Sequence, residues 1–196
     1  MSEGYQQALK FRAERIERLR EWCVTHLGDA ERRVLEIGCG HGHFLTAYAT
    51  EHPEQSCVGI DLVTKRIDKG NAKAEKRNLT QLCFLKAELS EFLEALPEGM
   101  LFERVFMLFP DPWPKKRHFK NRMIQPAFLE RLVEITTPEA DFCYRTDHEG
   151  YFAWTVEHIE ASPQWRIDPE APWPLEETSF FQDMMDSWQS LIAVKA

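Results

Sequence analysis

The stretch Val34-Leu35-Glu36-Ile37-Gly38-Cys39-Gly40-His41-Gly42-His43-Phe44 predicts the fold of this chain. An apolar run ends at a turn with three glycines, and a helical pattern begins directly after the turn. This order is typical of a buried parallel strand that passes through a tight turn into a helix. The spacing is GxGxG, with His43 where a dinucleotide-binding turn would have its third glycine. Glycines at these positions let the backbone turn tightly and let a ligand lie against it.

Glu36, near the end of the predicted strand, bears on which ligand the turn accepts. A pyrophosphate would lie poorly beside a carboxylate, because like charges repel. A cationic or zwitterionic ligand, such as the methionine part of S-adenosylmethionine, fits better. A tight structural turn without a ligand is the alternative that this stretch alone leaves open.

A second acid, Asp61, ends the next predicted strand in Val58-Gly59-Ile60-Asp61. It follows Gly40 by about 20 residues, the spacing at which adenosine sites on this fold place the acid that accepts the ribose hydroxyls. The other role common at this spot is a helix N-cap. Glu88, just past the third strand, either reaches an adenine amino group or is a surface or capping residue. The turn and the spaced acid together favour an adenosine-type cofactor.

Short apolar runs alternate with longer helical patterns along the rest of the chain, as in a mostly parallel sheet covered by helices. Strands are predicted at Arg33–Ile37, Cys57–Asp61, Leu82–Leu85, Val105–Phe109, Phe142–Thr146, Trp165–Ile167 and Ser190–Val194. Helices are predicted at Leu9–Trp22, Phe44–Thr50, Thr64–Lys76, Glu91–Leu96, Gln125–Ile135 and Tyr151–Ile159. The first of them has a narrow apolar edge of Phe11, Ile16 and Leu19. We expect one α/β domain with a seven-stranded, mostly parallel sheet and an antiparallel last strand. Residues 1–30 would form a helical extension and residues 33–196 the core.

The composition excludes several classes of protein. The chain has 196 residues, of which 43% are hydrophobic and 29% charged, which argues against a disordered or fibrous protein. No apolar run is long enough to span a membrane, and the charged N-terminal stretch has no apolar signal core. Five cysteines without a CxxC pair argue against a disulfide framework or a thiolate zinc site, and the histidines show no recognised metal spacing. We therefore expect a cytoplasmic protein that binds neither a membrane nor a metal.

The string Phe109-Pro110-Asp111-Pro112-Trp113-Pro114 follows the fourth predicted strand, at the edge where open α/β sheets bind ligands. Its three prolines fix the backbone, which can neither continue the strand nor readily begin a helix. Such a turn holds Asp111 rigidly, at the position from which base-modifying methyltransferases grip a nucleobase. A rigid loop with a solvated acid is the alternative.

A basic stretch, Lys115-Lys116-Arg117-His118-Phe119-Lys120-Asn121-Arg122, follows immediately, although the net charge of the chain is −8. The negative charge is concentrated after residue 122, so an acidic partner can bind the first part of the chain. Cations beside phosphates release counterions, and the aromatic and histidine rings can stack on an unpaired base. We predict contact with RNA or DNA, with a solvated basic face as the alternative.

Asp147 closes the fifth predicted strand, in Tyr144-Arg145-Thr146-Asp147, at the same edge of the sheet. Its carboxylate could accept the N1 and N2 protons of a guanine. The other interpretation is an N-cap for the helix that follows.

At these residues the chain resembles the bacterial tRNA (guanine-N7-)-methyltransferase family. The resemblance runs from about Arg33 to Tyr151 and rests most specifically on the string Phe109–His118; the glycine turn, Gly59–Asp61, Asn78-Leu79 and Thr146-Asp147 also match. It implies a class I, Rossmann-like fold of S-adenosylmethionine-dependent methyltransferases, with S-adenosylmethionine as cofactor. It further implies tRNA as partner, methylated at N7 of a guanine in the variable loop (position 46).

The resemblance also implies roles for individual residues. Cofactor binding is implied for Glu36, Gly38, Gly40, Gly42, Asp61, Glu88 and Asp111, and Asp111 is also the catalytic position. Substrate binding is implied for Lys115, Arg117, His118, Lys120, Arg122, Asp147 and Thr178. The chain departs from the family at Asp61, where Glu is usual, and at Phe181, which replaces the acid of a Thr-x-Phe-Glu substrate segment.

Two rival functions stay open at this point. A proline-bracketed acid also serves methylation of an exocyclic base amine. The altered segment at Thr178-Ser179-Phe180-Phe181 is compatible with a catalytically weak paralogue that binds cofactor or RNA. A monomer and a homodimer are both compatible with the sequence.

Overall fold

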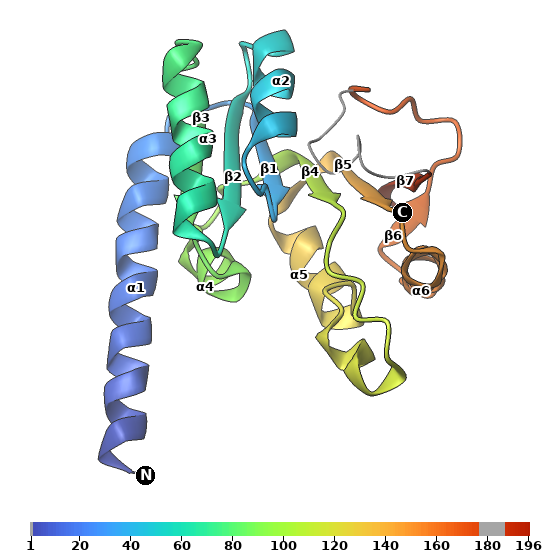
Figure 1. Ribbon diagram of the computed structural model, residues 1–196, viewed down its shortest axis with the longest axis horizontal. Helices are drawn as coiled ribbons and strands as arrows, with labels where there is room; N and C mark the ends of the chain where they lie inside the picture. The colour runs from blue at the N-terminus through green and yellow to red at the C-terminus, as the bar shows by residue number, and fades with distance from the viewer. Residues whose placement is uncertain (1, 177–186) are drawn as a thin grey trace.

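The computed structural model describes residues 2–176 and 187–196, whose strands form one seven-stranded sheet in the order β3-β2-β1-β4-β5-β7-β6 (Figure 1). The strands are β1 (Arg33–Ile37), β2 (Ser56–Asp61), β3 (Leu82–Lys86), β4 (Phe102–Leu108), β5 (Thr136–Thr146), β6 (Trp165–Ile167) and β7 (Gln189–Lys195). The first five strands pair in parallel, and β7 pairs antiparallel with both β5 and β6. The predicted seven-stranded sheet with an antiparallel last strand is confirmed.

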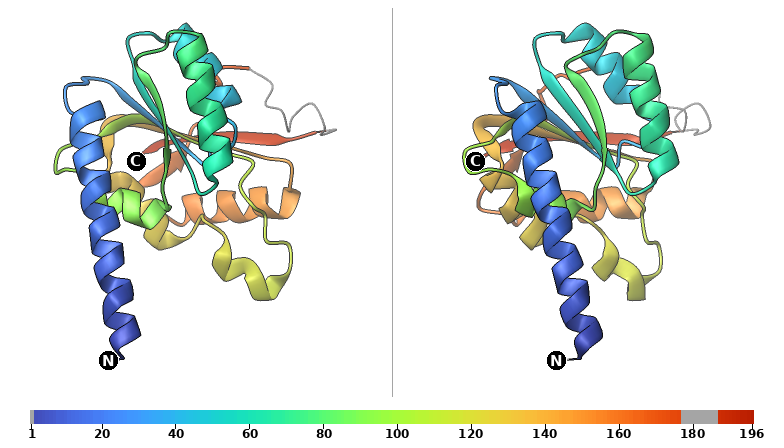
Figure 2. Two further views of the ribbon diagram at one scale, coloured as in Figure 1. Left: turned by 60° about the vertical axis from the view of Figure 1, so that its left-hand side comes forward. Right: turned by 90° about the vertical axis from the view of Figure 1, so that its left-hand side faces the viewer.

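Helices cover both faces of the sheet (Figure 2). They are α1 (Glu3–Leu27), α2 (His43–Glu51), α3 (Thr64–Lys76), α4 (Leu89–Ala95), the short 3-10 helix η1 (Lys116–Asn121), α5 (Pro126–Glu134) and α6 (Glu149–Glu160). Helices α1, α4, α5 and α6 share one core with Leu35 and Ile37 of β1, whereas α2 and α3 share a second core with Val34. Burial on both faces explains why the strands read as nearly continuous apolar runs.

Strand β5 and helix α1 extend well beyond their predicted bounds. β5 begins at Thr136 rather than at the predicted Phe142, and its pairing with β4 shifts register between Phe102 and Arg104. Helix α1 extends in both directions beyond Leu9–Trp22. Phe11, predicted to lie on its apolar edge, is 49% exposed, which corrects that prediction.

The parallel strands β1 to β5 all end at one edge of the sheet, which we call the carboxyl edge. The N-terminal half of α1 and the loop with η1 both extend beyond it in the two views of Figure 2. Further along α1, the side chains of Arg12 and Arg15 hold the helix to α4, each 2.5 Å from a carboxylate oxygen, of Glu94 and Glu91 respectively.

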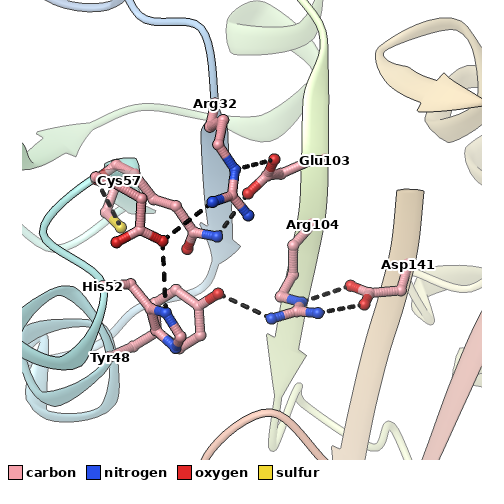
Figure 3. Close-up of polar contacts among 9 residues, drawn as sticks. Arg32, Tyr48, His52, Cys57, Glu103, Arg104 and Asp141 are labelled. Carbon is pink, nitrogen blue, oxygen red and sulfur yellow. Dashed lines mark hydrogen bonds and ion pairs between the residues drawn. The ribbon is translucent and has the colours of Figure 1, made fainter. Parts of the chain in front are cut away.

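A network of charged and polar side chains joins β4, β5 and α2 near the amino ends of the strands (Figure 3). Arg104 donates from Nε and Nη2 to the two oxygens of Asp141, at 2.7 and 2.5 Å, and from Nη1 to the hydroxyl of Tyr48 at 2.8 Å. Burial raises the pKa of Tyr48 to about 12. Arg104 therefore satisfies two partners that are largely removed from water.

We expect Arg104→Met to lower the free energy of unfolding by about 2 kcal/mol, because it leaves the Asp141 carboxylate and the Tyr48 hydroxyl without their donor. The control is Arg32→Met, since Arg32 pairs with Glu54 and Glu103 on a side chain that is 50% exposed. In Arg32→Met the free energy of unfolding should fall by about 1 kcal/mol or less. Urea unfolding measures the free energy of unfolding of both variants. Equal decreases would show that the buried Arg104 network stabilises the protein no more than the exposed ion pairs of Arg32.

Candidate active site

The glycine turn after β1 is folded back onto β2. The backbone N–H groups of Gly38 and Cys39 both donate to the carbonyl of Ile60, at 2.9 and 3.0 Å. The φ angles of Gly38, Gly40 and Gly42 are 76°, 53° and 67°, in the left-handed region that favours glycine. A tight turn that only glycine readily adopts is therefore present where the sequence predicted it.

The three glycines face different surroundings. A Cβ at Gly38 or Gly40 would meet nothing within 4 Å, so both face open space in which a ligand can lie. A Cβ at Gly42 would stand 2.4 Å from the ring of Phe84. The expectation that all three glycines make room for a ligand is therefore corrected at Gly42, where the core ring of Phe84 occupies the space.

Asp61, at the end of β2, braces this turn. Its Oδ2 accepts the Gly40 N–H at 3.1 Å and its Oδ1 accepts the Val63 N–H at 2.8 Å. Arg66 lies 3.4 Å from Oδ2. The carboxylate thus links the glycine turn to the start of α3, and it also lines the cavity described below.

Glu36 lies beneath the turn and is only 3% exposed. Its Oε2 is buried and has no hydrogen-bond partner. Burial raises the pKa of Glu36 to about 8; a hydrogen bond from the Leu45 backbone opposes this rise, and the charge of Asp61 adds to it. An unpaired buried carboxylate oxygen is a position that a donor or a positive charge would satisfy.

The buried carboxyl makes the stability of the ligand-free protein pH-dependent. The pKa of Glu36 rises from 4.5 to about 8 on folding, so the folded chain holds a proton that the unfolded chain releases between these values. Stability from this group is complete below the lower value and is lost as the pH rises through the upper one. The stability of Glu36→Gln relative to the wild type should therefore increase by roughly 3–4 kcal/mol between about pH 5 and about pH 8.

Urea unfolding of the two proteins at both pH values measures this difference. Glu51→Gln, at an exposed position of α2, controls for the change in net charge. If both variants showed the same pH trend, burial of Glu36 would not be its cause.

The proline-bracketed turn, residues 109–114, follows β4 and has a strained backbone. Phe109 and Trp113 have φ angles of 51° and 45°, which residues other than glycine rarely adopt. The Phe109 N–H donates to the carbonyl of Arg145 at 2.8 Å, which attaches the start of the turn to β5. Asp111 is exposed and faces the cavity.

An open cavity of about 560 Å³ lies at the carboxyl edge and brings these loops together. Its wall includes Asp61 at the end of β2, and Gly38, Glu88 and Asp111, which follow β1, β3 and β4. Glu88 also caps α4, since its carboxylate accepts the Glu91 N–H at 3.1 Å, so the capping role that the sequence left open is present. Four predicted site residues from four strand ends therefore meet at one cavity.

Other predicted residues lie outside the wall of this cavity. These are Glu36, Gly40, Gly42, Lys115, Arg117, His118, Lys120, Arg122 and Asp147. Asp147 is exposed at the end of β5 and does not cap α6, because the N-cap is His148, whose Nδ1 accepts the Tyr151 N–H at 3.0 Å. Thr178 and Phe181 lie outside the described residues.

Sequence reasoning missed several residues that line the cavity. Leu62 and Val63, directly after Asp61, are 64% and 42% exposed, and Met123 is 37% exposed. Asn121, at the end of η1, also lines it. Exposed apolar residues right after a strand-ending acid are the signal that could have identified the first two.

The basic stretch contains both exposed and buried cations. Lys115, Lys116, Arg117 and Lys120 are exposed beside the cavity, on or next to η1. Arg122 is only 3% exposed and donates to the backbone carbonyls of Pro112 and Gly150. The expectation that Arg122 contacts the substrate is therefore corrected, because its guanidinium is already enclosed by the protein.

Within the described ranges, no group of three or more His, Cys, Asp or Glu side chains is placed to hold a metal ion. The helices of residues 2–176 and 187–196 include none that is long and apolar enough to cross a membrane.

Known proteins resemble this chain in sequence, and solved structures resemble it in fold. Residues 30–186 match a family model described as "Putative methyltransferase". The chain is 37% identical over 157 residues to the tRNA (guanine-N(7)-)-methyltransferase of Synechococcus elongatus, covering 75% of this chain and 73% of that one. It is 36% identical over 138 residues to the enzyme of the same name from Rhodospirillum rubrum, covering 70% of this chain and 54% of the relative. The chain thus spans about half the length of the latter.

Solved structures share the fold at low identity. An antibiotic-related methyltransferase superposes with a TM-score of 0.60 at 16% identity, covering 90% of this chain and 93% of that one. The aminoglycoside resistance methyltransferase NpmB1 gives a TM-score of 0.59 at 14% identity, with the same coverage of both chains.

Proposed function

Because this chain belongs to the tRNA (guanine-N7-)-methyltransferase family, we propose that it transfers a methyl group from S-adenosylmethionine to N7 of a guanine in tRNA. The single observation that carries the proposal is the cavity at the carboxyl edge, where Gly38, Asp61, Glu88 and Asp111 meet. The variable-loop guanine at position 46 is the proposed target. We further propose a cytoplasmic location, a catalytic core at 33–196, and a monomer or homodimer.

The residues present fit S-adenosylmethionine. A cavity of about 560 Å³ is within the range of small-molecule sites. The open space over Gly38 and Gly40 admits a ligand against the backbone, and the unpaired Oε2 of Glu36 suits the ammonium end of an amino acid. We assign Asp61 to the ribose hydroxyls and Glu88 to the adenine amino group, because both line this cavity. When bound, the cofactor supplies an electrophilic methyl group on a sulfonium.

Methylation at N7 does not require a general base. N7 of guanine has an in-plane lone pair and no proton, so no side chain has to remove one. The protein must align the guanine with the methyl group and compensate the positive charge that develops on the purine. Asp111 at the cavity wall supplies a carboxylate for this charge, and Trp113, 36% exposed beside it, offers a ring on which a base can pack.

The exposed cations beside the cavity suit the phosphates of the substrate. Lys115, Lys116, Arg117 and Lys120 lie on or next to η1, which extends beyond the carboxyl edge. Each phosphate that such a group neutralises adds affinity without reading the sequence. Asp147, exposed at the end of the neighbouring strand β5, is the proposed reader of the guanine edge.

Incubation with labelled S-adenosylmethionine and unmodified total tRNA tests the proposal, with nucleoside analysis of the product. We expect 7-methylguanosine. A nucleoside methylated on an exocyclic amine would indicate the rival enzyme, and cofactor binding without turnover on any tRNA would indicate a binding protein.

A further inference from the structure

Arg122, the last cation of the basic stretch, is buried among aromatic rings. Its guanidinium carbon lies 3.8 Å from the ring centroid of Phe119, 4.9 Å from that of Tyr151 and 5.1 Å from that of Trp154. Burial lowers the pKa of Arg122. In the part of the chain that the structure describes, no carboxylate forms an ion pair with it. Ring faces therefore stabilise this cation in place of a carboxylate.

The hydrogen bonds of Arg122 join two loops of the candidate site. Its Nε donates to the carbonyl of Pro112 at 3.0 Å, and its Nη1 donates to the carbonyl of Gly150 at 3.1 Å. Pro112 directly follows Asp111, and Gly150 lies in the first turn of α6, close after Asp147. One planar group thus connects the segment that carries Asp111 to the segment that carries Asp147.

The proline-bracketed turn needs such an external donor. Prolines at 110, 112 and 114 have no backbone N–H, so the turn can form few hydrogen bonds of its own. It also contains the left-handed residues Phe109 and Trp113, and such conformations persist only where the surroundings enforce them. A buried guanidinium on the carbonyl of Pro112 is a contact of that kind.

The aromatic surroundings of Arg122 are themselves fixed. The Tyr151 hydroxyl accepts the N–H of Met123 at 2.9 Å and that of Ile124 at 3.3 Å, and the Trp154 Nε1–H donates to the carbonyl of Ile124 at 2.8 Å. These contacts attach the segment after η1 to α6. The segment directly after Arg122 is therefore held to the helix that carries two of the three rings.

We propose that Arg122 is a positioning residue, which holds the Asp111 turn in register with the Asp147 loop and contacts no phosphate of the RNA. The proposal deepens the proposed function, on which its effect on methyl transfer rests. Lysine cannot replace it, because an ammonium is not planar and cannot donate to both carbonyls while its faces lie against the rings.

The first test needs no substrate. Hydrogen exchange of the ligand-free protein should show faster exchange at the backbone N–H groups of the non-proline residues between 109 and 116 in Arg122→Lys than in wild type. The control is Arg117→Lys, an exposed cation of the same stretch, which should leave these amides unchanged. Unchanged exchange in Arg122→Lys would overturn the proposal whether or not the protein methylates tRNA, so this result is separate from any failure of the proposed function.

The second test separates positioning from RNA binding. In single-turnover methyl transfer at saturating tRNA, Arg122→Lys should be about 10–100-fold slower, because small displacements of reacting groups have effects of this size. Its tRNA affinity and the salt dependence of that affinity should match the wild type. Arg117→Ala should instead weaken tRNA binding, with a log–log salt slope reduced by about one unit. A reduced slope in Arg122→Ala, or a rate restored by excess tRNA, would overturn the proposal.

A milder variant covers the case in which Arg122→Lys does not fold. Phe119→Leu removes the nearest ring but keeps an apolar side chain of similar bulk at a half-buried position. It should show the same two changes, faster exchange at residues 109–116 and a slower rate, to a smaller extent. A normal rate together with normal exchange in this variant would contradict the proposal.

Discussion

Replacement of Asp111 by Ala is expected to slow single-turnover methyl transfer by on the order of 10²-fold or more. The carboxylate lies at the cavity wall on a turn that three prolines stiffen, so it is already in place when positive charge develops on the purine. A preorganised charge of this kind acts mainly in the transition state, so the rate should fall far more than the affinity for tRNA. Rapid mixing of enzyme, cofactor and saturating tRNA measures the rate.

Two further variants test whether the effect comes from the charge of Asp111. Asp111→Asn keeps the shape and removes the charge, so it should be nearly as slow as Asp111→Ala if the charge is what matters. Asp29→Asn, at an exposed position after α1, removes a charge away from the cavity and should leave the rate unchanged. Near-normal turnover in Asp111→Ala would remove this residue from the mechanism.

The second large effect is expected at Asp61. Its carboxylate accepts the backbone N–H groups of Gly40 and Val63 and is also the proposed acceptor for the ribose hydroxyls. Asp61→Ala removes both functions, since the glycine turn loses its brace and the ligand loses a charged acceptor. Because each charge-assisted hydrogen bond contributes about 1.5–3 kcal/mol, we expect the affinity for S-adenosylmethionine to fall about 100-fold.

Titration calorimetry measures this loss in Asp61→Ala and in Asp68→Ala, an exposed acid one helical turn into α3. The second variant has the same change in net charge and should bind normally. Asp61→Glu is a further comparison, because Glu is usual at this position in the family and keeps the charge. Wild-type affinity in Asp61→Ala would contradict the role of this residue in cofactor binding.

The sequence predicted the parts of the site that depend on local pattern. Strand ends were visible as apolar runs that stop at an acid or a glycine, and parallel strands bring such ends to one edge. For this reason Gly38, Asp61 and Asp111 could be placed together before any coordinates. The seven strands followed from the same alternation, with bounds shifted where polar residues such as Asp141 lie inside a strand.

Contacts between distant segments could not be predicted in this way. Arg122 looks like its exposed neighbours in the basic stretch, and only the fold brings Tyr151 and Trp154 of α6 around it. Tyr151 and Trp154 are three residues apart, so the sequence indicates that they share one face of a helix. It does not indicate which residue packs against them. Likewise, nothing near Gly42 in the sequence indicates that Phe84 fills the space beside it.

The ring of Phe84 has a consequence for how this protein can change over time. A Cβ built at Gly42, Gly59 or Gly70 would stand 2.4, 2.7 or 2.7 Å from that ring, so one side chain excludes substitution at three positions. The sizes of these four residues are therefore coupled. A larger residue at any of the three glycines requires a smaller side chain at 84, and at Gly59 it would also stand 2.8 Å from the Cβ of Cys39. At Gly42 a smaller side chain at 84 is not sufficient, because the new residue would also have to adopt the left-handed backbone.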